Sequence, residues 1–373
     1  MIVENNQPLG ALNTFGISAK AHRMVRIRTE SDLQAVLADP SCREAAKFIL
    51  GGGSNIVLTG DVKALVLKVE IMGRRLVSED DQAWVLEAGA GENWHEWVSW
   101  TLANGWPGLE NMAMIPGTVG AAPVQNIGAY GVELQDRFES LDAVDLQTGK
   151  TLTLKAEHCG FGYRDSVFKH GGAVNASRAD GVDLTNLADV TDDLRRARSP
   201  MGLAGRVLIT RVRFRLPKAW RADISYLDLT RKAEATGIAH PDATTIFNWV
   251  CEIRSAKLPD PKVLGNAGSF FKNPTVSAEQ CADIIARDPG VVHYVLADGR
   301  HKLAAGWLID ACGWRGKTMG HAGVYDKQAL VLVNRGDAQH PCTGGEVVTL
   351  AKAIQTSVYE RFGIRLEMEP VLV

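Results

Sequence analysis

The sequence predicts an α+β protein of two or three domains. Its 373 residues exceed the usual size of a single domain. Segments with helical periodicity and segments with strand alternation follow one another without an internal repeat. A glycine-dense run at residues 108–131 interrupts them, with five glycines, two prolines and Glu110 as its only charged side chain. Such a run is too apolar for a solvated linker and too rich in glycine for a buried helix.

The glycine-dense run has two interpretations that its residues alone do not separate. It is either a set of tight turns, or a backbone surface whose N–H groups hold a diphosphate or a flat ring. A second glycine turn, Gly51-Gly-Gly-Ser-Asn55, follows a strand-like segment. It is not a dinucleotide fingerprint, because Ile56 replaces the third glycine, and it lacks the Gly-Lys-Ser/Thr ending of a P-loop. Its backbone N–H groups still suit a phosphate.

Composition limits the classes of function. The chain is typical of a soluble globular protein, with 46% hydrophobic and 23% charged residues. Its net charge of −2 gives no overall positive potential that would attract nucleic acid or an anionic membrane. The N-terminal segment lacks the basic start and apolar core of a signal peptide, and no apolar run approaches the ~20 residues that span a bilayer. We therefore expect a cytoplasmic protein without a nucleic-acid or membrane partner.

The cysteines and histidines lead us to expect no metal. The six cysteines are scattered without a C-x-x-C pair, which is typical of reduced thiols. The nine histidines show neither H-x-x-x-H nor H-E-x-x-H spacing.

Hydrophobic periodicity, together with capping and turn-forming residues, predicts the helices and strands. Expected helices cover residues 30–38, 93–104, 244–253 and 277–287, a segment with Leu303, Trp307 and Ala311 on one face, and a last helix stopped by Gly363. Expected strands cover residues 47–50, 56–58, 64–69 and 84–88, with others within 141–154, 211–216 and 320–334.

Three segments carry more specific expectations. Asn93 is the expected N-cap of its helix, with Glu96 completing a capping box, and the helix's tryptophans are expected in the core. Arg211, Arg213 and Arg215 alternate with apolar residues, so they form a basic strand face that we expect to be only solvated. The segment of about residues 170–205 is acidic in its first part and basic in its second. We expect it to be an insertion at the surface with at most one short helix.

Several motifs together resemble the UDP-N-acetylenolpyruvoylglucosamine reductase (MurB) family over nearly the whole chain. The stretches that carry the resemblance are Asn13-Thr-Phe-Gly16, Gly51-Gly-Gly-Ser-Asn55, residues 108–134, Phe161-Gly-Tyr-Arg-Asp-Ser166, residues 265–274, residues 302–309 and the terminal Leu366-Glu-Met-Glu369. Tyr226, in a Tyr-x-Asp-Leu-Thr context, resembles the type of this family that has an extra tyrosine-bearing loop over the substrate.

The resemblance implies a two-subdomain FAD-binding fold, like that of vanillyl-alcohol-oxidase proteins, followed by an α/β substrate-binding domain. Residues 1–68, joined by the C-terminal segment 367–373, would form the first FAD-binding subdomain. Residues 69–258 would form the second, with the insertion at about 170–205. Residues 259–366 would hold the nucleotide sugar. A cytoplasmic monomer is implied.

The implied activity is NADPH-dependent reduction of the enolpyruvyl ether of UDP-N-acetylglucosamine to UDP-N-acetylmuramate, in peptidoglycan synthesis. NADPH would reduce non-covalently bound FAD, and hydride would then reach the vinyl carbon. Arg164 matches the arginine that stabilises the charge developing on the enol carboxylate. Ser269 matches the proton donor, acting by position with Lys272 as the neighbour that polarises it. Glu369 matches the glutamate near that carboxylate and would have to be protonated there.

The same matching assigns the binding residues. FAD would contact Gly51, Gly52, Gly53, Ser54, Asn55, Ile115, Pro116, Gly117, Thr118, Gly120, Ala121, Gln125, Asn126, Gly128, Ala129, Tyr130 and Gly131. Substrate would contact Tyr163, Tyr226, Lys257, Asn273 and Gln328, whose donors suit phosphate oxygens.

Three departures from the family pattern leave alternatives open. The first departure is an insertion that is longer than expected. The other two concern the C-terminus, where Pro370 follows Glu369 directly and only three residues come after Pro370. Glu367 is therefore the alternative active-site glutamate. Another flavin oxidase or dehydrogenase of the same fold, or a nucleotide-sugar binding protein without activity, are the competing functions. The strictness for NADPH over NADH and the role of the insertion are not determined by the sequence.

Overall fold

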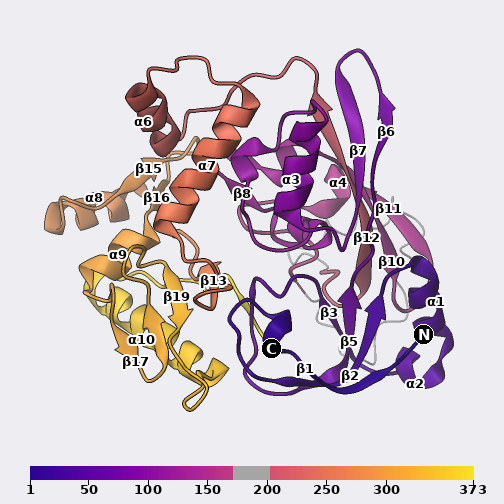
Figure 1. Cartoon of the computed structure of the whole chain (residues 1–373). Coiled ribbons are helices and arrows are strands. Elements are labelled where there is room, and N and C mark those ends of the chain that lie inside the picture. Colours follow the sequence, from indigo (N-terminus) through magenta and orange to yellow (C-terminus); the bar gives the residue numbers. More distant parts are fainter. Residues whose placement is uncertain (171–201) are drawn as a thin grey trace. The chain divides into compact units, whose positions relative to one another are not determined.

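The computed structural model describes residues 1–170 and 202–373, which contain interspersed helices and strands (Figure 1). The predicted insertion falls mainly on residues 171–201 and so lies outside the described residues. The chain divides into two compact units. The first unit comprises Met1–Asn6, His22–Gly52 and Lys63–Arg254, and the second comprises Gln7–Ala21, Gly53–Val62 and Ser255–Val373. The three-part domain division stays a prediction.

A five-stranded antiparallel sheet, in the order β11-β10-β12-β7-β6, forms the centre of the first unit. Its strands are β6 (Arg74–Glu79), β7 (Ala83–Gly89), β10 (Phe138–Asp145), β11 (Thr151–Lys155) and β12 (Val207–Pro217). The unit also holds α3 (Trp94–Ala103), α4 (Ala156–Cys159), α6 (Leu227–Thr236), most of α7 (Ala243–Lys257), and a short hairpin of β8 (Gly128–Ala129) and β9 (Val132–Glu133). The strands expected at 84–88, 141–154 and 211–216 are confirmed, and the last extends to Val207–Pro217.

A four-stranded sheet in the order β1-β2-β5-β3 contains most of the N-terminal strands. They are β1 (Glu4–Pro8), β2 (Lys20–Ile27), β3 (Lys47–Leu50) and β5 (Val62–Val69), and β3 runs parallel to β5. Between β2 and β3 lie α1 (Glu30–Ala38) and α2 (Pro40–Arg43). The expected helix at 30–38 is confirmed, because Thr29 and Asp32 close a capping box while Leu33 and Val36 are buried.

Helix α3 packs its tryptophans into the core of the first unit, as predicted. Trp94 and Trp97 are buried, and both rings contact Phe214 of β12, at centroid distances of 5.8 and 5.5 Å. Figure 1 shows α3 beside the strands of this sheet. The Asn93 side chain accepts a hydrogen bond from the Glu96 N–H at 3.1 Å, so the N-cap is confirmed. The Glu96 carboxylate instead pairs with Arg74, at 3.2 Å.

The arginine face of β12 is not merely solvated, and this expectation was wrong. Arg213 pairs with Asp142 of β10 and, at 2.8 Å, with Glu87 of β7. The Glu87 carboxylate is almost fully buried, so it needs charged partners in this position. The expectation failed because the carboxylate partners lie on the neighbouring strands β7 and β10. The sequence of β12 alone does not show which strands will be its neighbours.

The second unit contains two small sheets. Strands β13 (Asn266–Ser269), β19 (Val331–Asn334), β18 (Ala322–Val324) and β17 (Thr318–Met319) form one, in that order. Strands β14 (Thr275–Val276), β16 (His301–Leu303) and β15 (His293–Val295) form the other. Helices α8 (Ala278–Arg287), α9 (Ala305–Ala311) and α10 (Gly344–Phe362) complete the unit, with β4 (Ile56–Val57) and β20 (Val371–Leu372).

The helices of the second unit follow the predicted caps, with one correction. Ser277 caps α8, and α10 runs from the Thr343–Glu346 capping box to Gly363 at a φ of 70°. Leu303 does not lie on a helix, because it ends strand β16 before α9 begins. Leu303 is fully buried at the end of the strand. The apolar pattern therefore runs from the end of a strand into a helix, and it was mistaken for one face of a single helix.

The short C-terminus still forms a strand. Val371 and Leu372 pair in parallel with Ile56 and Val57, and the Val373 N–H donates to the Val57 carbonyl at 2.9 Å. Among residues 1–170 and 202–373, every helix is too short or too polar to serve as a membrane-spanning segment.

We expect Phe214→Ala to lower the free energy of unfolding by about 3–5 kcal/mol, because it opens a cavity between two buried tryptophans. The neighbouring Arg215→Ala is the matched control. Arg215 lies outside this packing, and its exposed pair with Asp80 adds little to stability. Urea unfolding of both variants measures the difference, and equal losses would contradict the assigned packing.

Candidate functional site

Two glycine segments of the first unit lie against each other through their backbones. A Cβ placed on Gly52 would lie 2.9 Å from the Gly117 Cα, and one on Gly51 would lie 2.9 Å from the Thr118 Oγ1. Gly117 itself has a φ of 123°, which strongly favours glycine. Both segments therefore need glycine, for contact as well as for conformation.

Residues 115–131 continue from this contact along a tightly turned path. They include a 3₁₀ segment (Val119–Gln125), Asn126 in the left-handed region and the β8–β9 hairpin. Gly120 packs directly on Ala90, where an added Cβ would lie 2.4 Å from the Ala90 Cβ. Both glycine-rich stretches predicted to hold FAD are thus compact, with Gly51 and Gly52 beside Gly117 and Thr118 in the first unit.

Backbone strain is concentrated around this path. Of the five non-glycine residues with positive φ in the described chain, four are Met114, Asn126, Tyr130 and Arg164. A non-glycine residue with positive φ costs of order 1–3 kcal/mol, and it keeps this conformation only where the surrounding structure fixes it. Such residues cluster at functional sites.

Three hydrogen bonds fasten the Arg164 loop to the glycine-rich segment. The Ser166 hydroxyl donates to the Val124 carbonyl at 2.6 Å, and the Asn126 amide donates to the Gly162 carbonyl at 3.1 Å. Arg164 Nη2 donates to the Gly128 carbonyl at 2.7 Å. Gly162 and Asp165 also exchange two backbone hydrogen bonds of 3.1 Å, so Tyr163 and Arg164 occupy the tip of a closed turn. The guanidinium of Arg164 is therefore held on the glycine-rich segment.

A second cation, Arg254, was missed by the sequence reasoning. It lies on α7 one turn after Val250, and its Nε is buried without a hydrogen-bond partner among the described residues. Its guanidinium bonds to the Tyr130 phenol, and burial lowers the pKa of Arg254, with the nearby Arg164 acting in the same direction. Desolvated neighbouring cations favour an anionic ligand. The available signal was an arginine in register with the buried positions Ile246 and Val250.

Tyr226 lies beside the same group. Its ring contacts that of Tyr130 edge-on, with centroids 5.2 Å apart. The buried Asn111 amide donates to the carbonyls of Tyr130 and Asp223, at 2.8 and 2.9 Å, and so ties the Tyr226 segment to the glycine-rich run. Glu110 has a structural role, since it accepts from Trp220 Nε1 and the Gly108 N–H, both at 2.6 Å.

In the second unit, a β-bulge positions Ser269. Strand β13 pairs with β19 at Asn266 and Ser269, with an irregularity between them at Gly268, whose φ is 70°. Bulges re-aim side chains next to active sites. The Ser269 side chain is exposed, while the following Phe270 and Phe271 are buried.

The C-terminal segment lies directly beside Ser269. The Phe270 carbonyl accepts from the Glu369 N–H at 2.9 Å, and Phe271 forms an isolated bridge with Met368. Glu369 is buried, with 9% of its surface exposed, whereas Glu367 is exposed and pairs with Lys272 at 2.5 Å. The ammonium of Lys272, considered above as a polariser of Ser269, thus has a carboxylate partner.

The remaining predicted residues of the second unit fall into two groups. Asn273 and Gln328 meet at the start of α9: the Asn273 Oδ1 accepts from the Ala305 N–H at 2.9 Å, and a Cβ on Gly306 would lie 2.8 Å from the Gln328 Oε1. Asn55 bonds to the C-terminal segment, with its amide donating to the Glu369 carbonyl at 3.3 Å. Lys257 ends α7 and is exposed.

Gly53 serves a structural contact with the Asn13-Thr-Phe-Gly16 motif. An added Cβ would lie 2.0 Å from the Leu12 carbonyl oxygen, and the Thr14 N–H donates to the Gly53 carbonyl at 3.0 Å. Asn13 is buried, and its side chain bonds to Leu9 and Ile17.

We expect ionisation of the Tyr130 phenol to lower the free energy of unfolding in alkaline solution. Burial raises its pKa to about 12, above the ordinary value of about 10. The folded state then holds the phenol proton more tightly, so this contribution is intact below about pH 10 and is lost as the pH rises toward 12. We expect Tyr130→Phe to flatten the decline, as measured by urea unfolding midpoints at about pH 9 and about pH 11. Parallel declines in both proteins would contradict the assignment; a constant offset would reflect only the lost bond to Arg254.

Comparisons with known proteins agree on one family. Residues 260–373 match the family described as the UDP-N-acetylenolpyruvoylglucosamine reductase C-terminal domain, and residues 21–155 match the FAD binding domain family. The UDP-N-acetylenolpyruvoylglucosamine reductase of Azoarcus sp. (strain BH72) is 51% identical, covering 100% of this chain and 98% of that protein. That of Paraburkholderia phymatum is 53% identical, covering 98% of this chain and 96% of the relative.

The solved structures contain the same fold. The crystal structure of UDP-N-acetylenolpyruvylglucosamine reductase (MurB) from Thermus caldophilus aligns with a TM-score of 0.61 at 22% identity, over 100% of this chain and 99% of that one. The predicted FAD-binding fold with a further C-terminal domain is thus confirmed. Because full-length relatives are more than half identical, this chain belongs to the UDP-N-acetylenolpyruvoylglucosamine reductase family.

Proposed function

We propose that this protein uses FAD and NADPH to reduce the enolpyruvyl ether of UDP-N-acetylglucosamine to UDP-N-acetylmuramate, a step of peptidoglycan precursor synthesis. The observation that carries the proposal is the arginine pair held at the glycine-rich segment. Arg164 is fastened to Gly128, and the partly buried Arg254, with its Nε fully buried, lies against Tyr130. The Gly128–Tyr130 stretch lies within the residues that match the FAD binding domain family.

The residues of the first unit fit FAD. Glycines at 51, 52 and 120 let the backbone segments of this unit pack closely on one another, and a glycine-rich backbone suits N–H contacts to a diphosphate and close approach of a flat ring. The cofactor contacts proposed are those of residues 51–55, 115–118, 120–121, 125–126 and 128–131. When bound, FAD supplies the hydride for the vinyl carbon after accepting it from NADPH.

Arg164 has the proposed task of stabilising charge on the substrate. Hydride addition to the vinyl carbon leaves an electron pair on the adjacent carbon and its carboxylate. A fixed guanidinium stabilises this developing charge without reorganisation, because its position is set before the reaction begins. Arg254 adds positive charge to the same group of residues and is proposed as a second anion-binding residue.

Ser269 is the proposed proton donor to the resulting carbanion centre. A serine hydroxyl is a weak acid, so it acts by position, and the β-bulge at Gly268 supplies a defined position. Glu369 is the proposed partner near the substrate carboxylate. Its burial beside Phe270 favours it over Glu367, which is exposed and neutralised by Lys272.

The remaining donors are proposed to bind the uridine diphosphate sugar. They are Tyr163, Tyr226, Lys257, Asn273 and Gln328. Because the Asn273 oxygen is engaged by the Ala305 N–H, its NH₂ group is the one offered to a phosphate. We further propose that the protein is a cytoplasmic monomer, with FAD-binding subdomains at residues 1–68 and 69–258 and a substrate domain at 259–366.

The two half-reactions test the function and the role of Ser269 together. In the wild type, we expect NADPH to bleach the flavin absorbance and the enolpyruvyl nucleotide to restore it. In Ser269→Ala, bleaching by NADPH should stay near normal, while restoration should slow by about 10²–10⁴-fold, because only that step needs the proton. Stopped-flow absorbance measures both rates.

Ser357→Ala is the control, since its hydroxyl only bonds to the Ala353 carbonyl within α10. If both half-reactions slow equally in Ser269→Ala, the proton-donor role is wrong. If the wild-type flavin is not restored by the enolpyruvyl nucleotide, the proposed substrate is wrong.

Gly52→Ala should weaken FAD binding. Its Cβ would push against the Gly117 backbone, and overpacking of this kind costs about 1–3 kcal/mol, equivalent to about 5–150-fold in the FAD dissociation constant. Gly60→Ala is the matched control, because nothing lies within 4 Å of an added Cβ there. Flavin fluorescence titration compares the two, and unchanged binding in Gly52→Ala would place FAD elsewhere.

A further inference from the structure

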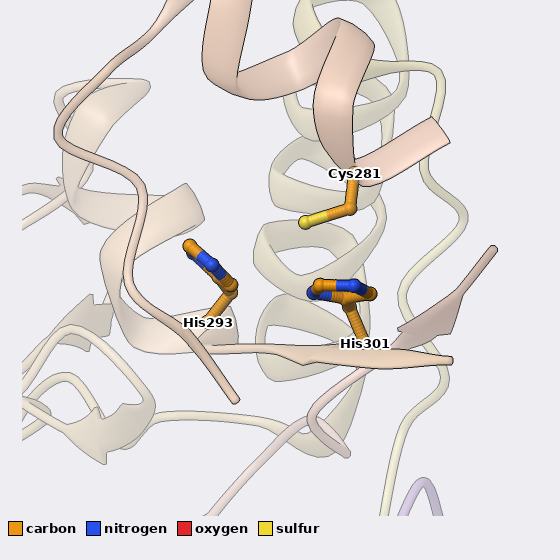
Figure 2. A group of neighbouring side chains, drawn as sticks. All are labelled: Cys281, His293 and His301. Atoms are coloured by element: carbon orange, nitrogen blue, oxygen red, sulfur yellow. The ribbon is translucent and has the colours of Figure 1, made fainter. Parts of the chain in front are cut away.

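Three metal-ligating side chains converge in the second unit, and none of them is among the residues assigned above. The ligand atoms of Cys281, His293 and His301 all lie within 4.8 Å of one another. Figure 2 shows the Cys281 sulfur, from α8, directed toward the two imidazoles, which come from the β15–β16 hairpin. The rings lie 5.4 Å apart between centroids and are tilted by 40°, so they are not stacked on each other.

The hairpin register places both histidines on one face. His301 lies opposite Val295, two residues beyond His293 along β15. Side chains two residues apart share a face, so His293 and His301 are diagonal neighbours on it. Leu303, opposite His293, lies on this face and is fully buried. At its Leu303 end this face packs inward, the two histidines are partly buried, and Cys281 is fully buried.

The nitrogens of the two imidazoles are arranged as a metal site requires. The His293 Nδ1 lies 3.2 Å from the Val291 carbonyl, which can only accept, so Nδ1 carries the proton and Nε2 keeps its lone pair for a ligand. Such a second hydrogen bond is the usual support of a metal-binding histidine. The His301 Nδ1 is buried without a hydrogen-bond partner among the described residues. Buried polar nitrogens are rarely left so, and a metal ion would supply the missing partner.

From this geometry we propose that Cys281, His293 and His301 bind a zinc ion. One thiolate and two imidazoles form a ligand set that zinc favours, and bond lengths of about 2.0–2.3 Å place tetrahedral ligand atoms about 3.6 Å apart. The observed separations of up to 4.8 Å need only side-chain adjustment to reach that value. On binding, the Cys281 thiol releases its proton to water and the sulfur forms the metal bond. Water completes the fourth position.

The spacing of the ligands explains why local motifs predicted no metal. Eleven residues separate Cys281 from His293 and seven separate His293 from His301, so neither pair fits a helical or knuckle spacing. The ion would join α8 to the β15–β16 hairpin and so fix this part of the second unit. None of the three side chains belongs to the proposed catalytic or binding residues, so the ion would be distinct from the reaction site.

Metal analysis of the full-length protein tests the proposal. After chelator treatment and dialysis against zinc, we expect one zinc ion per chain and a higher midpoint of thermal unfolding. Cobalt in place of zinc should give thiolate charge-transfer absorption together with the visible bands of a tetrahedral ion. Cys281→Ala should abolish the thiolate band, and both Cys281→Ala and His301→Gln should weaken zinc binding by about 100-fold or more.

Cys342→Ala and His340→Gln are the controls, because they remove a similarly buried thiol and another imidazole of the same unit. Both should keep the zinc ion and the cobalt spectrum. Less than stoichiometric zinc in the wild type, a cobalt spectrum without thiolate bands, or full zinc binding by His301→Gln would each overturn the proposal. His301→Gln keeps the test valid if Cys281→Ala fails to fold.

Discussion

The close backbone contact between two glycine segments is the constraint on which the first unit depends. Gly51 and Gly52 meet Gly117 and Thr118 at distances that no side chain tolerates. This contact sets the start of the 115–131 path, whose strained residues then carry the Arg164 loop. A ligand that lies on this path meets backbone instead of side chains, which is what a diphosphate and a flat ring require.

Buried charge is the second organising feature. The first unit tolerates Glu87 in its sheet because Arg213 and Arg75 satisfy it, so that charge is structural. Arg254 is different, because its Nε has no hydrogen-bond partner within the described residues and the nearby Arg164 adds a second positive charge. Two neighbouring cations, one of them desolvated, are costly in an isolated fold, and their retention is understandable where an anionic substrate completes the site.

Local sequence signals predicted the longer helices correctly, and the two errors share a cause. Helix α1, the Asn93 cap and the Thr343–Gly363 helix follow from capping and periodicity, which act over a few residues. Leu303 was misplaced because its burial is supplied by other elements, and the arginines of β12 were misjudged because their partners lie on β7 and β10. Motifs named the candidate residues Arg164 and Ser269, but not Arg254.

The sequence by itself determined the family, the glycine-rich segments and the identities of the candidate catalytic residues, because these are encoded in contiguous motifs. Only the tertiary structure decided that Arg164 is clamped by Asn126 and Ser166, that a bulge positions Ser269, and that Glu369 is buried while Glu367 pairs with Lys272. It alone gathered Cys281, His293 and His301. Such features depend on side chains far apart in the sequence, whose distances are set by packing and strand register rather than by spacing along the chain.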